Sequence, residues 1–187
     1  MACTIATGKA RYCKVQPGGI DKVYVISRFD TNRVTALTLT DGVLTSTGLA
    51  PALDAADFFQ FDCDPYLSAL TQTIVVNEGG GVGYQQDLEL VFKGAFGEAD
   101  VVFQNLINGT WQMAVLDNTG TVYFVGFDKG AICTGGSFIH NGDKALSDNL
   151  AYTMTFAATE LLPATNCGTE ANFTEQVTVS TVQVTGA

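Results

Sequence analysis

The feature that most constrains the fold of this chain is a two-residue alternation of apolar and polar side chains, repeated in short runs. In RVTALTLT, from Arg33 to Thr40, apolar residues alternate with threonine, and FTEQVTVSTVQVT, from Phe173 to Thr185, follows the same rule with a slip near Ser180. Successive side chains of an extended strand point to opposite faces, so this period is typical of strands. Thr, Val and Phe are abundant, Pro is scarce and glycines punctuate the sequence, which favours a mainly β protein.

Similar runs occupy much of the chain. We expect further strands in KVYVISRF, FFQFDCDP, ALTQTIVVNE, YQQDLELVFKG, TWQMAVLDN, TVYFVGF and LAYTMTFAATE. Asp41-Gly42 is a preferred dipeptide for a two-residue turn, so we expect a hairpin from Val34 to Thr47. The stretch from Gly79 to Gly83, GGGVG, lacks the Lys-Ser or Lys-Thr of a phosphate-binding loop and precedes a strand-like segment. We therefore interpret it as a connection between two strands.

Two segments depart from the alternation. Val102 and Leu106 lie four positions apart within Gly97 to Thr110, and Asn108-Gly109 is a helix stop, which predicts one helix packed on a sheet. Residues Gly48 to Asp57 break the strand pattern and predict a loop or a short helical turn. With 187 residues, of which 47% are hydrophobic, the chain suits one domain with a sizeable core.

The chain is strongly acidic. Nineteen Asp and Glu against nine Lys and Arg give a net charge of −10, which argues against tight binding to a nucleic-acid backbone. An acidic wall would instead favour DNA that slides past without adhering. No window approaches the roughly 20 apolar residues of a membrane-spanning helix, and the N-terminus has no apolar core of signal-peptide length, so we expect neither a membrane span nor export. The five cysteines form no Cys-x-x-Cys pair and are expected to be free thiols in a reducing cytoplasm.

The residues that could carry chemistry form no catalytic pattern. His140 is the single histidine, and Ser137, Asp143 and Cys133 lie near it in sequence, but no nucleophile motif surrounds them. Asp117-Asn118-Thr119-Gly120 offers either ligands for a metal ion or the tip of a hairpin. The tetrapeptide lacks the spaced ligands of a calcium loop, and Asp, Asn and Gly favour turns, so we expect a turn without a metal. We predict no catalytic residue, no cofactor and no metal site.

The second half of the chain resembles a family of virion proteins. Between about residues 70 and 165, the strand DLELVFKG leads to a helix, and WQMAVLDNTG turns into TVYFVGFDKG. A glycine-rich loop, TGGSFIHNGDKALSD, then leads to AYTMTFAATE. This succession is similar to the tail tube proteins of tailed bacteriophages, in particular those of phages infecting Bacteroidetes-type hosts.

The resemblance implies one structural domain over residues 1–187, a β-sandwich or partial barrel with one flanking α-helix. Copies would close hexameric rings by continuing their sheets, and stacked rings would form a tube for DNA ejection. An N-terminal arm (about 1–19), a loop insertion (about 42–57) and the C-terminal strand (about 173–185) would connect the rings. In the loop we place apolar assembly contacts at Leu44, Leu49 and Leu53. The expected partners are other copies, other tail proteins and passing DNA, in a virion tail assembled in the host cytoplasm.

Two alternatives stay open. The chain could be another virion component, such as a head decoration, connector or baseplate protein. It could also be a carbohydrate-binding module, with Trp111 as the residue that stacks on a sugar. Trp111 opens a predicted strand, however, so it could equally anchor the helix on the sheet.

Overall fold

The computed structural model describes residues 18–40, 43–50, 57–76, 78–93, 99–139 and 151–181 of the chain. Within these ranges the strands are β1 (Ile20–Ser27), β2 (Ala36–Thr40), β3 (Val43–Ala50), β4 (Asp57–Asp62), β5 (Ala69–Val76), β6 (Val82–Lys93), β7 (Thr110–Asp117), β8 (Thr121–Val125), β9 (Ala131–Ile139), β10 (Ala151–Glu160), β11 (Thr165–Thr169) and β12 (Thr178–Thr181). The helices are α1 (Ala99–Asn108) and α2 (Glu170–Thr174). The prediction of a mainly β protein with a flanking helix is confirmed.

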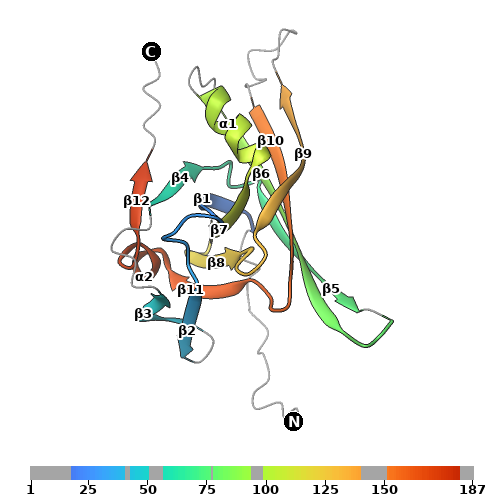
Figure 1. The fold of residues 1–187 in the computed structure, drawn as a ribbon. Coiled ribbons are helices and arrows are strands. Elements are labelled where there is room, and N and C mark those ends of the chain that lie inside the picture. Colours follow the sequence, from blue (N-terminus) through green and yellow to red (C-terminus); the bar gives the residue numbers. More distant parts are fainter. Residues whose placement is uncertain are drawn as a thin grey trace, which may run out of the picture.

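Ten of these strands form one sheet, and β2 pairs with β3 in a separate hairpin. The order across the large sheet is β12-β4-β1-β7-β9-β10-β6-β5, while β8 joins β7 to β11. Neighbouring strands are antiparallel, except that β12 and β4 are parallel. Within the described residues the sheet is open, and its end strands β5 and β12 lie on opposite sides of the molecule in Figure 1.

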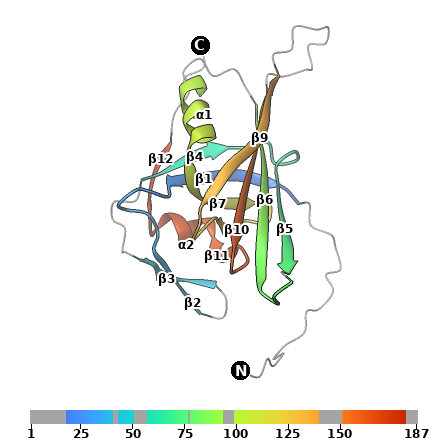
Figure 2. The same cartoon turned by 45° about the vertical axis from the view of Figure 1, so that its right-hand side comes forward.

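The strands β1 and β7 in the middle of the sheet are buried on both faces. Val23 and Val25 of β1 belong to one apolar core, whereas Tyr24 and Ile26 of the same strand belong to a second. The first core also contains residues of β6, β10 and α1, and the second contains residues of β4, β8 and α2. The sheet therefore folds back over itself, and β1 runs across the direction of β6 and β10 in Figure 2. This burial on both faces explains the continuous apolar runs VYVI in β1 and MAVL in β7.

The helix α1 ends where its sequence predicts, and as described it begins at Ala99 within the predicted segment. Its last residue is Asn108, and a Cβ atom on Gly109 would lie 2.2 Å from the ring of Trp111. The indole Nε1 of Trp111 donates a hydrogen bond to the carbonyl oxygen of Leu106 at 2.9 Å. Trp111 thus fastens the end of α1 to the start of β7, which confirms the anchoring role considered from the sequence.

The segment from 42 to 57 corrects one expectation. The predicted hairpin is present, since Leu39 lies opposite Leu44 and Thr40 opposite Val43. β3 continues to Ala50, however, so residues 48–50, predicted as the start of a loop, are part of a strand. The strand persists because its backbone pairing with β2 extends to Ala50, which lies opposite Ala36. Residues 51–56 lie outside the described residues.

Two further expectations were wrong. The run from Phe173 to Thr185 is not one strand: α2 ends at Thr174 and β12 begins only at Thr178. The helix forms because the hydroxyl of Thr169 caps it, accepting from the amide of Asn172 at 3.4 Å, while Phe173 is buried in the second core. The glycine-rich stretch predicted as a loop from Thr134 begins instead as part of β9, because its backbone pairs with β10.

Candidate functional site

The tetrapeptide Asp117-Asn118-Thr119-Gly120 is the turn between β7 and β8, as predicted. Oδ1 of Asp117 accepts hydrogen bonds from the amides of Thr119 at 2.6 Å and Thr121 at 3.2 Å, and also from the Thr119 hydroxyl. The side-chain amide of Asn118 donates to the carbonyl oxygens of Gly18 at 2.9 Å and Pro65 at 3.0 Å. The polar side chains that suggested an ion site therefore serve the turn. Within the described ranges, no three His, Cys, Asp or Glu residues are grouped to hold a metal ion.

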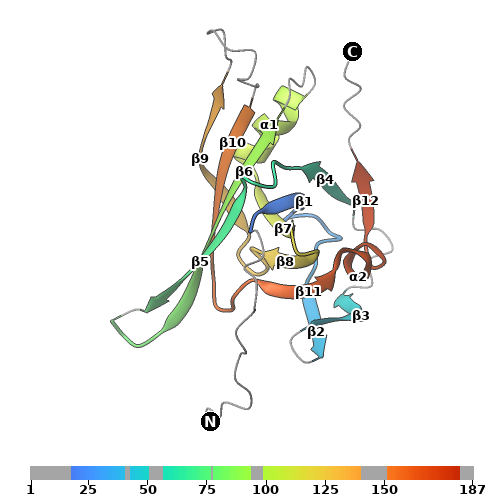
Figure 3. The same ribbon diagram turned by 180° about the vertical axis from the view of Figure 1, so that it is seen from behind.

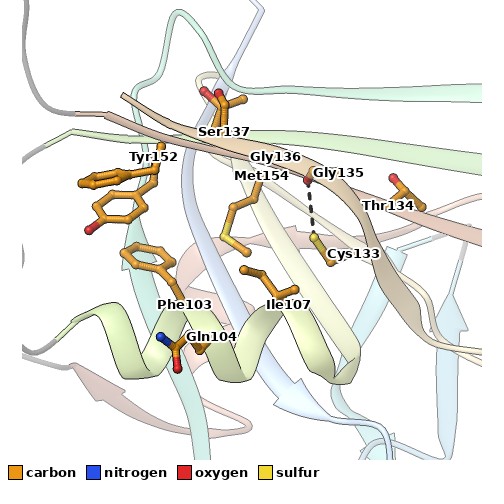
Figure 4. Close-up of a pocket in the computed structure, with 12 residues that line it drawn as sticks. Phe103, Gln104, Ile107, Cys133, Thr134, Gly135, Gly136, Ser137, Tyr152 and Met154 are labelled. Atoms are coloured by element: carbon orange, nitrogen blue, oxygen red, sulfur yellow. Dashed lines mark hydrogen bonds between the residues drawn. The ribbon is translucent and has the colours of Figure 1, made fainter. Parts of the chain in front are cut away.

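The other chemical candidates do not converge on one site. His140 and Asp143 lie outside the described residues. Cys133 and Ser137 are both on β9, but Cys133 lies opposite Phe156 and Ser137 opposite Thr153, so the two side chains occupy different faces of the sheet. Figure 4 shows Cys133 on the side of α1 and Ser137 on the other side. The indole of Trp111 is half-buried against the helix, which disfavours the sugar-binding alternative.

The predicted assembly contacts are not tested by side-chain positions. The backbone of Leu44 and Leu49 belongs to β3, but the positions of these two side chains are not described. Leu53 lies outside the described residues. Their role as apolar contacts stays a prediction.

A long hairpin is formed by β5 and β6, the two strands predicted on either side of the glycine-rich connection, but its exposed apolar end was not predicted. It projects from the sheet, away from α1, in Figures 1 and 3. Ile74 lies opposite Tyr84 and Val76 opposite Val82, so these four side chains share one face near the turn. The exposed fractions of Ile74, Val76 and Val82 are 63%, 66% and 49%. We call these three residues the hairpin tip.

The second feature that sequence analysis missed is a groove between α1 and the strands β9 and β10. It forms a hollow of about 650 Å³ with Phe103 and Ile107 of the helix on one wall and Gly135, Gly136 and Cys133 of β9 on the other. None of the residues that line it carries a charge. Ile107, on the helix wall, is 52% exposed. We call this hollow the α1–β9 groove.

Stacked aromatic rings make one end of the groove rigid. The ring centroids of Phe138 and Tyr152 are 4.1 Å apart, and those of Tyr152 and Phe103 are 4.3 Å apart. The ring of Phe103 in turn packs against that of Phe92 in the first core, with their centroids 5.3 Å apart. This continuous row joins the groove to the core, so the groove is preformed rather than made by loose side chains.

Two carboxylates join distant elements and respond to acid in opposite ways. Oε1 of Glu170 accepts from Nζ of Lys22 at 2.7 Å and from the Tyr24 hydroxyl at 2.6 Å, which holds the pKa of Glu170 below its ordinary value. Oε1 of Glu160 accepts from the amides of Asp128 at 3.0 Å and Lys129 at 2.8 Å. Burial nevertheless raises the pKa of Glu160. Both carboxylates hold the fold together and neither faces the groove.

The described cysteines have no disulfide. Cys63, Cys133 and Cys167 are free thiols, and burial raises the pKa of Cys167 to about 12. Cys167 is therefore protonated at neutral pH and unsuited to act as a nucleophile. Of these three cysteines, Cys133 lines the groove.

Comparisons with protein-family models, curated proteins and solved structures give no match to this chain. Among the described residues, no helix has the length and apolar character needed to span a membrane.

Proposed function

We propose that this chain is a self-assembling structural protein of a virion, most specifically the tail tube subunit whose stacked hexameric rings conduct DNA. The observation that carries the proposal is the β5–β6 hairpin with its exposed tip of Ile74, Val76 and Val82. No described residue covers this apolar face. Such an exposed strand invites association, so a chain that keeps it is expected to have a partner for it.

The two ends of the sheet support association between copies. β5 pairs only with β6, and β12 pairs only with β4, among the described residues. Each therefore offers unpaired backbone groups along one edge. A ring in which the sheet of one copy continues into the next would pair these edges and leave no open end.

One face of the sheet fits the wall of a conduit. On the side away from α1, the strands β5, β6 and β10 carry small hydroxylated residues such as Thr71, Thr153 and Thr155. Among side chains described on this face of β6, the charged ones are Asp87 and Glu89, both acidic. A surface of this kind repels phosphate and offers little for DNA to adhere to.

Electron microscopy of the purified protein tests the proposal. We expect hollow tubes or rings in negative stain, and their loss in the double variant Ile74→Asp with Val76→Asp, because buried charges oppose association. The matched control is Phe29→Asp, which also replaces an exposed residue, at 80% exposed. A protein that stays monomeric at high concentration would overturn the proposal.

A second experiment separates the tube from other virion roles. Asp87→Lys with Glu89→Lys is expected to leave tube assembly intact while slowing DNA passage, because a basic wall binds phosphate. Measurement of DNA release from virions that carry the variant checks this. Unchanged DNA release with normal assembly would favour a decoration, connector or baseplate role.

A further inference from the structure

We propose that the α1–β9 groove is the receptor for the hairpin tip of a second copy of this chain, an inference that rests on the proposed self-assembly. The groove and the tip lie at opposite ends of the molecule. In Figures 1, 2 and 3 α1 lies at the top, and the turn of the β5–β6 hairpin lies toward the bottom. One copy therefore presents a projection at one end and a hollow at the other.

The chemistry of the two surfaces matches. Ile74, Val76 and Val82 give the tip an apolar face, and Phe103, Ile107 and Met154 line the groove. Neither set includes a charged residue, although the chain carries a net charge of −10. Two copies of so acidic a chain repel each other over most of their surfaces. Contact between them is favoured where charge is absent and apolar area is buried.

The wall of the groove formed by β9 suits an incoming strand. The hollow of about 650 Å³ is lined by consecutive residues of β9 from Cys133 to Phe138, among which Gly135 and Gly136 present bare backbone. β9 pairs with β7 only at Ala131 and Ile132, so among the described residues its edge beyond Ile132 has no strand on the β7 side. An incoming β5 could pair with that edge while its side chains enter the hollow, as in strand addition.

A contact between one end of a copy and the opposite end of the next is heterologous. Such contacts do not close between two copies, and they generate rows of subunits that share one direction. In the proposed tube, this contact would join successive rings. It would use only the end of β5 from Ile74 to Val76, so that residues 69–73 of β5 stay available to pair with β12 of a neighbour within a ring.

A disulfide trap tests the inference with a thiol that the groove already holds. Val76→Cys places a second thiol on the tip, and oxidation of assembled protein should join it to Cys133 of the next copy, because a disulfide forms only where Cα atoms approach within about 7 Å. We expect a ladder of covalent oligomers on a non-reducing gel. The ladder should disappear in Val76→Cys with Cys133→Ser.

The matched control is Val75→Cys, on the opposite face of the same strand and 40% exposed. We expect it to form no ladder that depends on Cys133. A charge pair adds a second readout: Ile107→Asp should abolish stacking, and Ile107→Asp with Val76→Lys should restore part of it. Recovery of stacking in the double variant would show that Ile107 and Val76 of two copies are in contact, because a misfolded Ile107→Asp protein would not be repaired by a change on the hairpin tip.

The contrary outcomes separate this inference from the proposed function. Tubes that form normally while Val76→Cys gives no Cys133-dependent ladder would overturn the receptor assignment and leave the tube proposal standing. Tubes in which Cys133 still reacts with a maleimide would show a groove left open for another ligand, and would also overturn it. A chain that never assembles would overturn both.

Discussion

The hairpins β5–β6 and β7–β8 both turn at a glycine, but one projects from the molecule and the other is packed into it. Each turn contains a glycine in the left-handed region, Gly80 with φ of 78° and Gly120 with φ of 80°. The β7–β8 turn is fastened to neighbouring segments through Asn118, and Val122 just after it is fully buried. The β5–β6 hairpin projects, and Val82 just after its turn is 49% exposed. The acidic, chemically suggestive turn is therefore structural, and the plain glycine-rich one is the candidate for function.

The largest expected difference is in the energy of core packing. Val122→Ala should lower the free energy of unfolding by about 2 kcal/mol, because it removes two buried methyl groups and leaves a cavity. Val82→Ala should change it by less than about 0.5 kcal/mol, as expected for an exposed position. Urea denaturation of both variants, with tube formation measured in parallel, checks the pair. Equal losses of stability would mean that the β5–β6 hairpin belongs to the cooperative core.

A second pair compares the two turns. A Cβ atom would meet nothing within 4 Å at either Gly80 or Gly120, so valine at each position adds only backbone strain. Strain of this kind costs about 1–3 kcal/mol. Gly120→Val should show that cost in global unfolding, because its hairpin is buried in the second core. Gly80→Val should mainly fray its own hairpin and impair assembly. Denaturation curves and hydrogen exchange distinguish the two; equal global losses would contradict the contrast.

Sequence alone predicts most of the strands, because many carry their own two-residue period, but it does not predict β11 or α2. It does not predict which of them are central. The run IVV at the end of β5 is apolar at every position, as is VYVI in β1, yet Ile74 is exposed and Ile26 is buried. The difference arises from the sheet order, which places β5 at an end and β1 between β4 and β7. That order depends on contacts between residues far apart in the chain, which local patterns do not encode.

The candidate site was missed for the same reason. The α1–β9 groove brings together Ile107 of the helix, Gly135 of β9 and Met154 of β10. Each residue has an ordinary local role: a helical apolar stripe, a glycine-rich stretch and an alternating strand. Gly135-Gly136 favoured a loop by composition, but pairing with β10 holds it as a strand. Only tertiary structure shows that this bare backbone forms a wall.

A smaller effect concerns acid and the fastening of α2. Glu170 has a lowered pKa in the folded state, so its contribution to stability is present at neutral pH and is lost as the pH falls through that pKa. The side chains of Lys22 and Glu170 are 28% and 36% exposed, so we expect their ion pair to add only about 0.5 kcal/mol to the free energy of unfolding. Glu170→Gln should remove this part of the acid dependence in a pH series of urea denaturations. An unchanged acid limb would show that the ion pair contributes nothing.

Glu160 supplies the control for that measurement, because its pKa is raised rather than lowered. The raised pKa means that the folded state binds a proton more tightly than the unfolded chain does. The protonated form of Glu160 therefore contributes to the free energy of unfolding. This contribution is fully present below the ordinary glutamate pKa and is lost as the pH rises through the pKa of the folded state. Glu160→Gln should change the pH dependence in the opposite direction from Glu170→Gln. A change of the pH dependence in the same direction for both variants would contradict the causes given for the two pKa shifts.

The smallest expected effect is that of a chelator. EDTA should leave the midpoint of thermal unfolding and tube formation unchanged, because Oδ1 of Asp117 already accepts hydrogen bonds from two backbone amides. The Asn118 side chain donates to two carbonyl oxygens, so its amide group is oriented toward protein partners instead of a cation. A drop in the midpoint with EDTA that calcium reverses would restore an ion at the β7–β8 turn. That result would also reverse the contrast between the hairpins, since the fastened turn would then be the chemical site.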